Sequence, residues 1–240
     1  MIKKLNSSLL TCVVALSFCL LTGLSLQAAD WGRFRGPNGN GYSAEAKFPA
    51  TFEIEKALWK SPVPGKGNSS PVIGGGNIYV TSANTESGVR KLNAIDVESG
   101  KLVWSVEFPL QVFKAHKRNG FASSTPCVDE KHVYVLWQSA TNSAIHALDH
   151  QGKEVWKYAL GGFAAGPGCA TSPILHAGRL LLTHDNEKHE SFLLALDAGT
   201  GTECWKTLRK TQRTGFSTPV IFQGKSGETQ VIFSHAYEGV

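Results

Sequence analysis

Residues 94–104 read Ala-Ile-Asp-Val-Glu-Ser-Gly-Lys-Leu-Val-Trp, and related stretches occur at residues 147–156 (Ala-Leu-Asp-His-Gln-Gly-Lys-Glu-Val-Trp) and 195–205 (Ala-Leu-Asp-Ala-Gly-Thr-Gly-Thr-Glu-Cys-Trp). Each copy has an alanine, an aspartate two positions later, a short polar turn, and a tryptophan four positions after a glycine. The tryptophans lie 52 and 49 residues apart. A repeat of this length is typical of stacked or radial structural units.

Each copy predicts a β-hairpin. Residues 89–96 and 101–107 are rich in apolar and β-branched residues and flank a polar turn. Aspartate at the start of such a turn accepts hydrogen bonds from the following backbone, and glycine supplies a positive φ at low cost. The middle copy is one residue shorter, and the missing residue lies in the turn, so its tryptophan keeps the same face of the sheet. We therefore expect Trp104, Trp156 and Trp205 to pack equivalently against a neighbouring sheet.

A second recurring element is a pair of serine or threonine residues followed by proline. The prolines are Pro71, Pro126, Pro173 and Pro219, spaced by 55, 47 and 46 residues. Proline is tolerated at the start of a strand, because its missing N–H need not join the ladder. Further strand-like runs follow the first three prolines at residues 77–81, 132–136 and 179–183. Four strands per repeat, ordered from inner to outer, predict the blades of a β-propeller.

The pattern Ala-x-Asp-x-x-[Ser/Thr]-Gly-x-x-x-Trp resembles the tryptophan-docking repeat of pyrroloquinoline-quinone (PQQ)-like propellers. That family includes quinoprotein alcohol dehydrogenases and the non-catalytic outer-membrane assembly factor BamB. The resemblance covers residues 59–240. Residues 31–41 and 119–126 also resemble segments of secreted PQQ-like propellers from planctomycete-type bacteria. The resemblance implies an all-β propeller of four-stranded antiparallel blades.

The order of the segments predicts export. Lys3 and Lys4 precede an apolar run that ends near Ala28 and Ala29, which is the pattern of a secretory signal peptide. We expect a signal peptide over residues 1–29, a periplasmic or secreted protein, and no stable membrane span after cleavage. An extended N-terminal segment is expected over residues 30–55.

The propeller itself is expected over residues 56–240. Its blades are predicted at residues 67–108, 119–160 and 166–208, and an incomplete fourth blade at 213–240. Residues 56–60 are expected to form a lone outermost strand. Because a closed propeller has roughly four to eight blades, about three and a half blades predict the N-terminal part of a longer protein.

Composition narrows the function classes. The formal net charge of +5 is small and dispersed, which argues against a nucleic-acid partner. Basic clusters at residues 114–118 and 209–213 are expected to be solvated loop charge, with a patch for an anionic ligand as the alternative. Cys127, Cys169 and Cys204 match no zinc spacing. We expect them to be small buried hydrophobic residues. The alternative is that two of them form a disulfide.

Candidate chemistry is sparse. Residues 184–190 read His-Asp-Asn-Glu-Lys-His-Glu, and a hairpin tip is predicted there, with a metal site as the alternative. Residues 65–67 and 166–168 are expected to be turns between blades. Small polar residues before each proline are expected at one mouth of the central channel, either because ligands bind there or because they fit a narrow hub. These residues are Asn68, Asn119, Ser123, Thr171 and Ser217.

We expect an exported, non-catalytic propeller that binds a protein, peptide or glycan at its mouth. The alternatives are a PQQ-dependent quinoprotein dehydrogenase that oxidises alcohols or sugars, and a sensor or targeting module of a larger enzyme. The dehydrogenase requires a PQQ pocket, calcium ligands and a catalytic aspartate. The family's dehydrogenases also carry two adjacent cysteines, which this sequence lacks. No catalytic, cofactor-binding or metal-binding residue is assigned.

Overall fold

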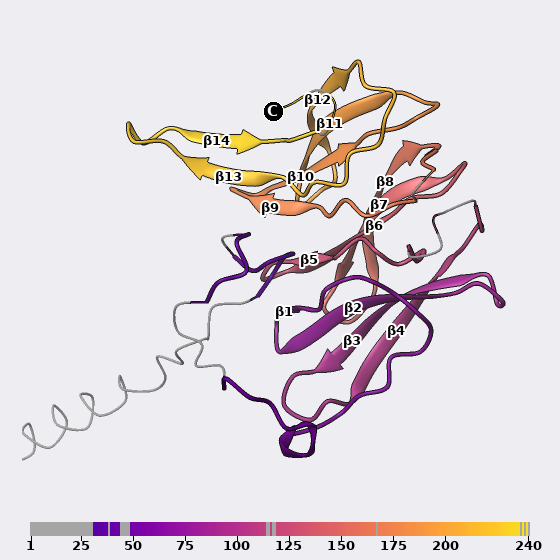
Figure 1. Cartoon of the computed structure of the whole chain (residues 1–240), viewed down its shortest axis with the longest axis vertical. Helices are drawn as coiled ribbons and strands as arrows, with labels where there is room; N and C mark the ends of the chain where they lie inside the picture. The colour runs from indigo at the N-terminus through magenta and orange to yellow at the C-terminus, as the bar shows by residue number, and fades with distance from the viewer. Residues whose placement is uncertain are drawn as a thin grey trace, which may run out of the picture.

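The computed structural model describes residues 31–37, 39–43, 49–113, 116, 119–166, 168–235, 237 and 239 (Figure 1). The expected signal peptide lies outside the described residues. The described part is all-β apart from one short 3-10 helix, η1 (Ile54–Lys56). It contains no helix with the length and apolar character needed to cross a lipid bilayer.

The strands form three four-stranded antiparallel sheets, which we call blades 1, 2 and 3, and one two-stranded sheet. Blade 1 contains β1 (Val72–Gly74), β2 (Asn77–Asn84), β3 (Val89–Asp96) and β4 (Leu102–Pro109), in that order. Blade 2 contains β5 (Cys127–Val128), β6 (His132–Trp137), β7 (Ser143–Asp149) and β8 (Glu154–Gly161). Blade 3 contains β9 (Ile174–His176), β10 (Arg179–His184), β11 (Ser191–Asp197) and β12 (Glu203–Arg209). Strands β13 (Val220–Gln223) and β14 (Thr229–Ile232) pair as the start of a further blade.

The blades follow one another through the molecule in sequence order, from the purple blade 1 to the orange blade 3 in Figure 1. Their short inner strands are neighbours, since β1 contacts β5 and β5 contacts β9. The described sheets do not close into a ring. This arrangement confirms the predicted fold class, an incomplete propeller of four-stranded antiparallel blades.

The repeated hairpins are built as the sequence predicts. Ala94, Ala147 and Ala195 lie directly opposite the three tryptophans of the repeat, and the register shifts by one residue immediately after each alanine. The aspartate side chain closes each turn. In blade 1, for example, Asp96 Oδ1 accepts a hydrogen bond from the backbone N–H of Ser99 at 2.8 Å.

Two of the three tryptophan side chains reach the hairpin turn of the next blade, whereas Trp205 packs against the two-stranded sheet, with its ring centre 6.2 Å from that of Phe233. The indole N–H of Trp104 donates to the carbonyl oxygen of His150 at 2.8 Å, and that of Trp156 donates to Ala198 at 3.0 Å. The rings lie on the turn glycines, which have positive φ angles of 87° at Gly152 and 72° at Gly201. An added Cβ would lie 3.0 Å from Trp104 at Gly152 and 2.6 Å from Trp156 at Gly201. The glycine is therefore required twice, for its backbone angle and for the close approach of the ring.

The prediction that residues 56–60 form an outermost strand is wrong. Helix η1 ends at Lys56, the residues after it belong to no strand, and Leu58 is 98% exposed. Instead, the Trp59 ring lies on Gly100 of blade 1, and its N–H donates to the carbonyl oxygen of Val97 at 3.1 Å. Trp59 makes the contact that the tryptophan of a preceding blade would make, so side-chain packing holds this segment without strand pairing.

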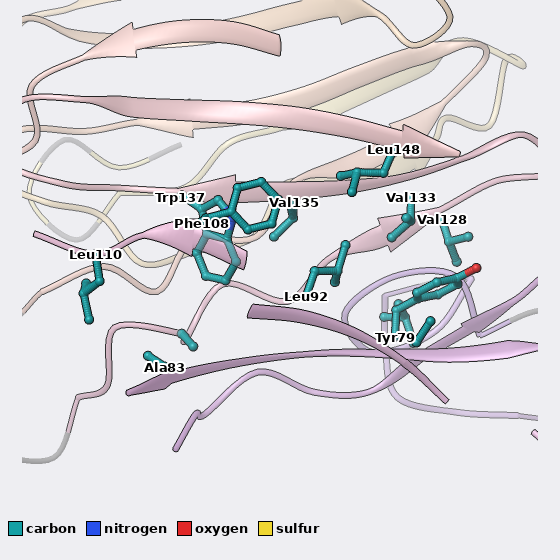
Figure 2. Close-up of a cluster of buried hydrophobic side chains, with 13 residues drawn as sticks. Tyr79, Ala83, Leu92, Phe108, Leu110, Val128, Val133, Val135, Trp137 and Leu148 are labelled. Atoms are coloured by element: carbon teal, nitrogen blue, oxygen red, sulfur yellow. The ribbon is translucent and has the colours of Figure 1, made fainter. Parts of the chain in front are cut away.

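The hydrophobic core lies between the blades rather than within one sheet. Figure 2 shows Leu92 and Tyr79 of blade 1 facing Val133, Val135 and Leu148 of blade 2. All five are fully buried. A second cluster of the same kind joins blades 2 and 3. Burying an aliphatic side chain stabilises the fold by about 1.5–3 kcal/mol, so each blade depends on its neighbours for stability.

The first described residues of the N-terminal segment pack against the inner strands, whereas residues 49–55 are exposed. The carbonyl oxygens of Trp31 and Gly32 accept hydrogen bonds from Ile73 of β1 at 3.0 Å and Val128 of β5 at 2.8 Å. Arg33 is buried and donates to the carbonyl oxygen of Pro219 at 3.3 Å. Residues 33–36 form a turn rather than the expected extended conformation. The segment thus contacts the inner strands of two blades and the chain just before β13.

Candidate ligand-binding site at the propeller hub

A pocket of about 480 Å³ opens where the inner strands converge, and we call it the hub pocket. Its volume lies within the range of small-molecule sites. The pocket is lined by the N-terminal segment and by the connections that lead into blades 1 to 3 and into β13. The lining residues are Phe34, Asn68, His116, Asn119, Ser123, Thr125, Ala170, Ser172, Phe216 and Thr218.

Three of the five residues predicted at the channel mouth line the hub pocket: Asn68, Asn119 and Ser123. Thr171 and Ser217 do not. The Thr171 hydroxyl lies 3.0 Å from that of Thr183 and donates to the carbonyl oxygen of Ser217 at 3.1 Å. The Ser217 hydroxyl donates to the carbonyl oxygen of Ser234. The hydroxyl groups of these two residues therefore form hydrogen bonds within and between blades and do not face the pocket.

The residues immediately before three of the four prolines line the pocket instead, whereas Ser70 before Pro71 does not. The three lining residues are Thr125, Ser172 and Thr218. In extended backbone, successive side chains point to opposite sides. When the residue two positions before a proline faces the blade, the residue one position before it therefore faces the pocket. Counting this alternation backwards from Pro126, Pro173 and Pro219 would have identified them in the sequence.

The same hydroxyl groups link the blades around the hub. Thr125 Oγ1 accepts a hydrogen bond from the backbone N–H of Ser70 at 3.0 Å. Ser172 Oγ accepts one from the backbone N–H of Thr125, also at 3.0 Å. A hydroxyl has one donor and two acceptor sites. After accepting these bonds, each group retains its O–H for a ligand in the pocket.

Asn119 and Ser123 are held in place by their own hydrogen bonds. Asn119 Nδ2 donates to the carbonyl oxygen of Cys169 at 3.1 Å, which links the entry of blade 2 to the entry of blade 3. The Ser123 hydroxyl lies 2.5 Å from Asn119 Oδ1. A Cβ added at Gly120 would lie 2.9 Å from Asn68 Oδ1, so this wall of the pocket is closely packed.

The described lining of the hub pocket is polar and aromatic rather than charged. It includes no Asp, Glu, Lys or Arg, and one imidazole, that of His116. Phe34 and Phe216 supply aromatic surface beside the hydroxyl and amide groups. The described lining therefore suits an uncharged polar ligand with an apolar face.

The other sequence candidates lie elsewhere. Residues 185–190 join β10 to β11, as predicted for a hairpin tip, but the tip is not simply solvated. Asn186 is fully buried, and its amide donates to the carbonyl oxygen of Gly162 at 2.7 Å. Within the described ranges, no three potential metal-ligand side chains lie close enough to hold an ion.

In the two basic clusters, the described residue that departs from the expected solvated loop charge is Arg209, since Lys210 and Arg213 are exposed. Residues 114, 115, 117 and 118 lie outside the described residues, and His116 lines the hub pocket. Arg209 lies 3.3 Å from Asp185 Oδ1, and only 11% and 1% of their side chains are exposed. This ion pair packs inside the molecule, because Arg209 ends β12 beside the buried loop that follows β10.

The three cysteines within the described residues are free thiols. Cys127 and Cys169 are buried, as expected, and burial raises the pKa of the Cys169 thiol to about 11. Cys204 is exposed, because it lies on β12, the outer strand of blade 3. The expectation of a buried cysteine is therefore wrong for Cys204.

Comparison with solved structures finds similar folds in much larger enzymes. A europium-containing methanol dehydrogenase aligns at 19% identity over 57% of this chain and 24% of its own, with a TM-score of 0.43. A quinohemoprotein alcohol dehydrogenase from Comamonas testosteroni aligns at 21% identity over 60% of this chain and 21% of its own, with a TM-score of 0.45. The corresponding enzyme from Pseudomonas putida HK5 aligns at 17% identity, 62% and 22% coverage, and a TM-score of 0.44. The chain thus spans a quarter or less of these enzymes.

Comparison with curated proteins finds no match. The family model described as "Outer membrane protein assembly factor BamB" matches residues 50–142 and 92–236, two overlapping ranges that together cover most of the chain. These ranges include all three hairpin repeats and the strands of every blade described above. The chain therefore belongs to this BamB-like family of PQQ-repeat β-propellers.

Proposed function

We propose that this protein is an exported, non-catalytic binding module that holds a protein, peptide or glycan ligand in the hub pocket. The observation that carries the proposal is the lining of that pocket. It combines serine and threonine hydroxyls, asparagine amides, one imidazole and two phenylalanine rings, and the described lining contains no Asp, Glu, Lys or Arg.

Such a lining suits peptide and sugar groups. Hydroxyl and amide side chains both donate and accept hydrogen bonds, which matches backbone amides and sugar hydroxyls. Aromatic rings cover the apolar parts of either ligand. The membership in a family described as an assembly factor supports a protein or peptide among these ligands. The same description and the signal-like sequence of residues 1–29 support a periplasmic or secreted location.

The quinoprotein alternative fits the hub pocket less well. It requires calcium ligands and a catalytic aspartate, and the described lining residues include no carboxylate. Neutral amides and hydroxyls are weaker partners for a divalent cation than carboxylates are.

The test uses binding to arrays of unmodified peptides and soluble oligosaccharides. The wild-type protein is compared with Phe216→Ala, which removes one aromatic wall of the hub pocket, and with Phe222→Ala, a matched control on β13. Phe216 and Phe222 are 41% and 48% exposed, so neither change empties the core.

We expect the wild-type protein to bind at least one of the two ligand classes. Phe216→Ala should bind it at least tenfold more weakly, and Phe222→Ala should bind it as the wild type does. If Phe216→Ala bound the ligand with wild-type affinity, the hub pocket would be excluded as the binding site. Stoichiometric binding of added PQQ with calcium, accompanied by alcohol oxidation, would instead favour the dehydrogenase.

A further inference from the structure

A second cavity, of about 420 Å³, lies between blades 1 and 2, and we call it the inter-blade cleft. It shares no lining residue with the hub pocket. Arg90 and Phe108 line it from blade 1, and Trp137, Ala144, His146 and Lys157 line it from blade 2. Figure 2 shows Phe108 beside Trp137, and their ring centres are 5.5 Å apart.

Arg90 places a buried positive charge behind the cleft. It is 4% exposed, and its Nη1 and Nη2 atoms donate to the carbonyl oxygens of Gln138 and Pro109 at 2.9 and 3.0 Å. Its guanidinium lies 4.9 Å from the centre of the Trp137 ring. Within the described part of the chain, no carboxylate forms an ion pair with it. Burying an arginine without a counter-charge is costly, and an anion in the cleft would reduce that cost.

Two further basic groups line the blade 2 side. His146 on β7 and Lys157 on β8 are directly opposite each other in the sheet. His146 Nδ1 lies 2.5 Å from Glu154 Oε2, and burial lowers the pKa of His146, so the positive charge on this side of the cleft comes from Lys157. Lys157 is exposed and forms no ion pair with any described residue. The charge of Lys157 therefore remains available at the mouth of the cleft.

The equivalent place between blades 2 and 3 is filled. Counted from the repeat alanines Ala147 and Ala195, Ala144 corresponds to Phe192, and counted from the repeat tryptophans, Lys157 corresponds to Lys206. The Phe192 side chain is buried there, and Lys206 Nζ lies 4.1 Å from the centre of its ring and 2.6 Å from Glu190. An open, cationic cleft is thus a property of one interface and not of the repeat.

We propose that the inter-blade cleft binds a small molecule that carries a phosphate monoester. A phosphate monoester has a charge of about −1.5 to −2 at neutral pH, which matches Arg90 and Lys157 together better than a single carboxylate does. Lysine binds phosphate as a point charge. The amide of Asn142 adds a donor at the cleft, and Phe108 and Ala144 provide an apolar wall for the organic part of the ligand.

The experiment titrates the purified full chain with glycerol 3-phosphate at constant ionic strength and follows binding by calorimetry. Lys157→Gln removes the cation at the mouth. Ala144→Phe introduces the residue that fills the corresponding place in blade 3. Lys206→Gln is the matched control, and succinate tests whether a dicarboxylate binds instead. Thermal unfolding identifies any variant that fails to fold. Lys157→Gln changes an exposed residue and keeps the test valid if Ala144→Phe does not fold.

We expect saturable binding of glycerol 3-phosphate, at least tenfold weaker in Lys157→Gln, absent in folded Ala144→Phe, and unchanged in Lys206→Gln. The proposal is overturned by the absence of saturable binding, by equal weakening in both lysine variants, or by preferential binding of succinate. Phe216→Ala should leave this binding unchanged, which separates the cleft from the hub pocket.

Discussion

The two complete blade interfaces share one end and differ at the other. At the shared end, Tyr79 packs beside Trp104 and Tyr134 beside Trp156, each pair with ring centres 5.8 Å apart. At the other end, Trp137 and Ala144 between blades 1 and 2 are replaced by His184 and Phe192 between blades 2 and 3.

The difference shows which part of the repeat the fold requires. The docked tryptophan and the turn glycine are kept at both interfaces because they set the distance between neighbouring blades. The far ends of strands β6, β7, β10 and β11 only need to fill space. One interface leaves a cationic cleft there, and the other buries a phenylalanine and a histidine.

The largest expected effect tests the shared end. Trp104→Ala and Trp156→Ala should each lower the free energy of unfolding by about 3–4 kcal/mol, towards the lower end of the usual cost of truncating a tryptophan, because both rings are partly buried. Chemical denaturation of the full chain measures both values. Similar losses would support equivalent docking, whereas a wild-type midpoint for either variant would show that this contact is dispensable.

The next effect tests the end that differs, through pH. Burial lowers the pKa of His184 to about 4, with smaller contributions in the same direction from Lys206 and His189. Above about pH 6.5 the ring is neutral in both the folded and the unfolded chain. As the pH falls towards 4, only the unfolded chain takes up the proton, so stability decreases by up to about 3 kcal/mol.

Replacing His184 with leucine should remove this part of the acid sensitivity. Urea unfolding of the wild-type and His184→Leu proteins at pH 7 and pH 4.5 provides the measurement. A matched Trp137→Leu variant at the equivalent position should keep the wild-type pH dependence. If His184→Leu also kept the wild-type pH dependence of stability, a group other than His184 would be responsible for the acid sensitivity.

A smaller difference is expected between the two turn glycines. Alanine at either position must adopt a positive φ, which costs about 1–3 kcal/mol. The added Cβ would lie 2.6 Å from the tryptophan ring at Gly201 and 3.0 Å at Gly152. Gly201→Ala should therefore be the more destabilising of the two in thermal unfolding. The reverse order would mean that the ring of Trp156 moves aside more easily than that of Trp104.

The smallest effect separates the two corresponding lysines. Lys206 lies over Phe192 and pairs with Glu190, whereas Lys157 forms no ion pair in the described structure. Lys206→Gln should cost about 0.5–1 kcal/mol, as expected for a partly exposed pair, and Lys157→Gln close to nothing. Differential scanning calorimetry of the two variants in phosphate-free buffer makes the comparison. Equal losses would contradict the different environments described here.

The hairpins could be predicted from the sequence because local spacing determines them. The strand expected over residues 89–96 is β3 with the same bounds. The positions of Trp59, Asn186 and Arg209 could not be predicted, since each depends on contacts with a segment distant in sequence. For the hub pocket, polar composition identified Asn68, Asn119 and Ser123, but the pre-proline hydroxyls required the side-chain alternation as well.

The hydrogen bond from Arg33 to Pro219 spans 186 residues, the greatest sequence separation in the hub. Contacts of such separation require closure of a very long loop and form late in folding. We therefore expect the first described residues of the chain to reach their final place after blades 1 to 3 have formed. Because Phe34 of this segment lines the hub pocket, the pocket is completed in the same late step. Pulse-labelling hydrogen exchange should record later protection of the Val128 amide, which donates to Gly32, than of the amides within the blades, and the ability to bind a ligand would report that folding has finished.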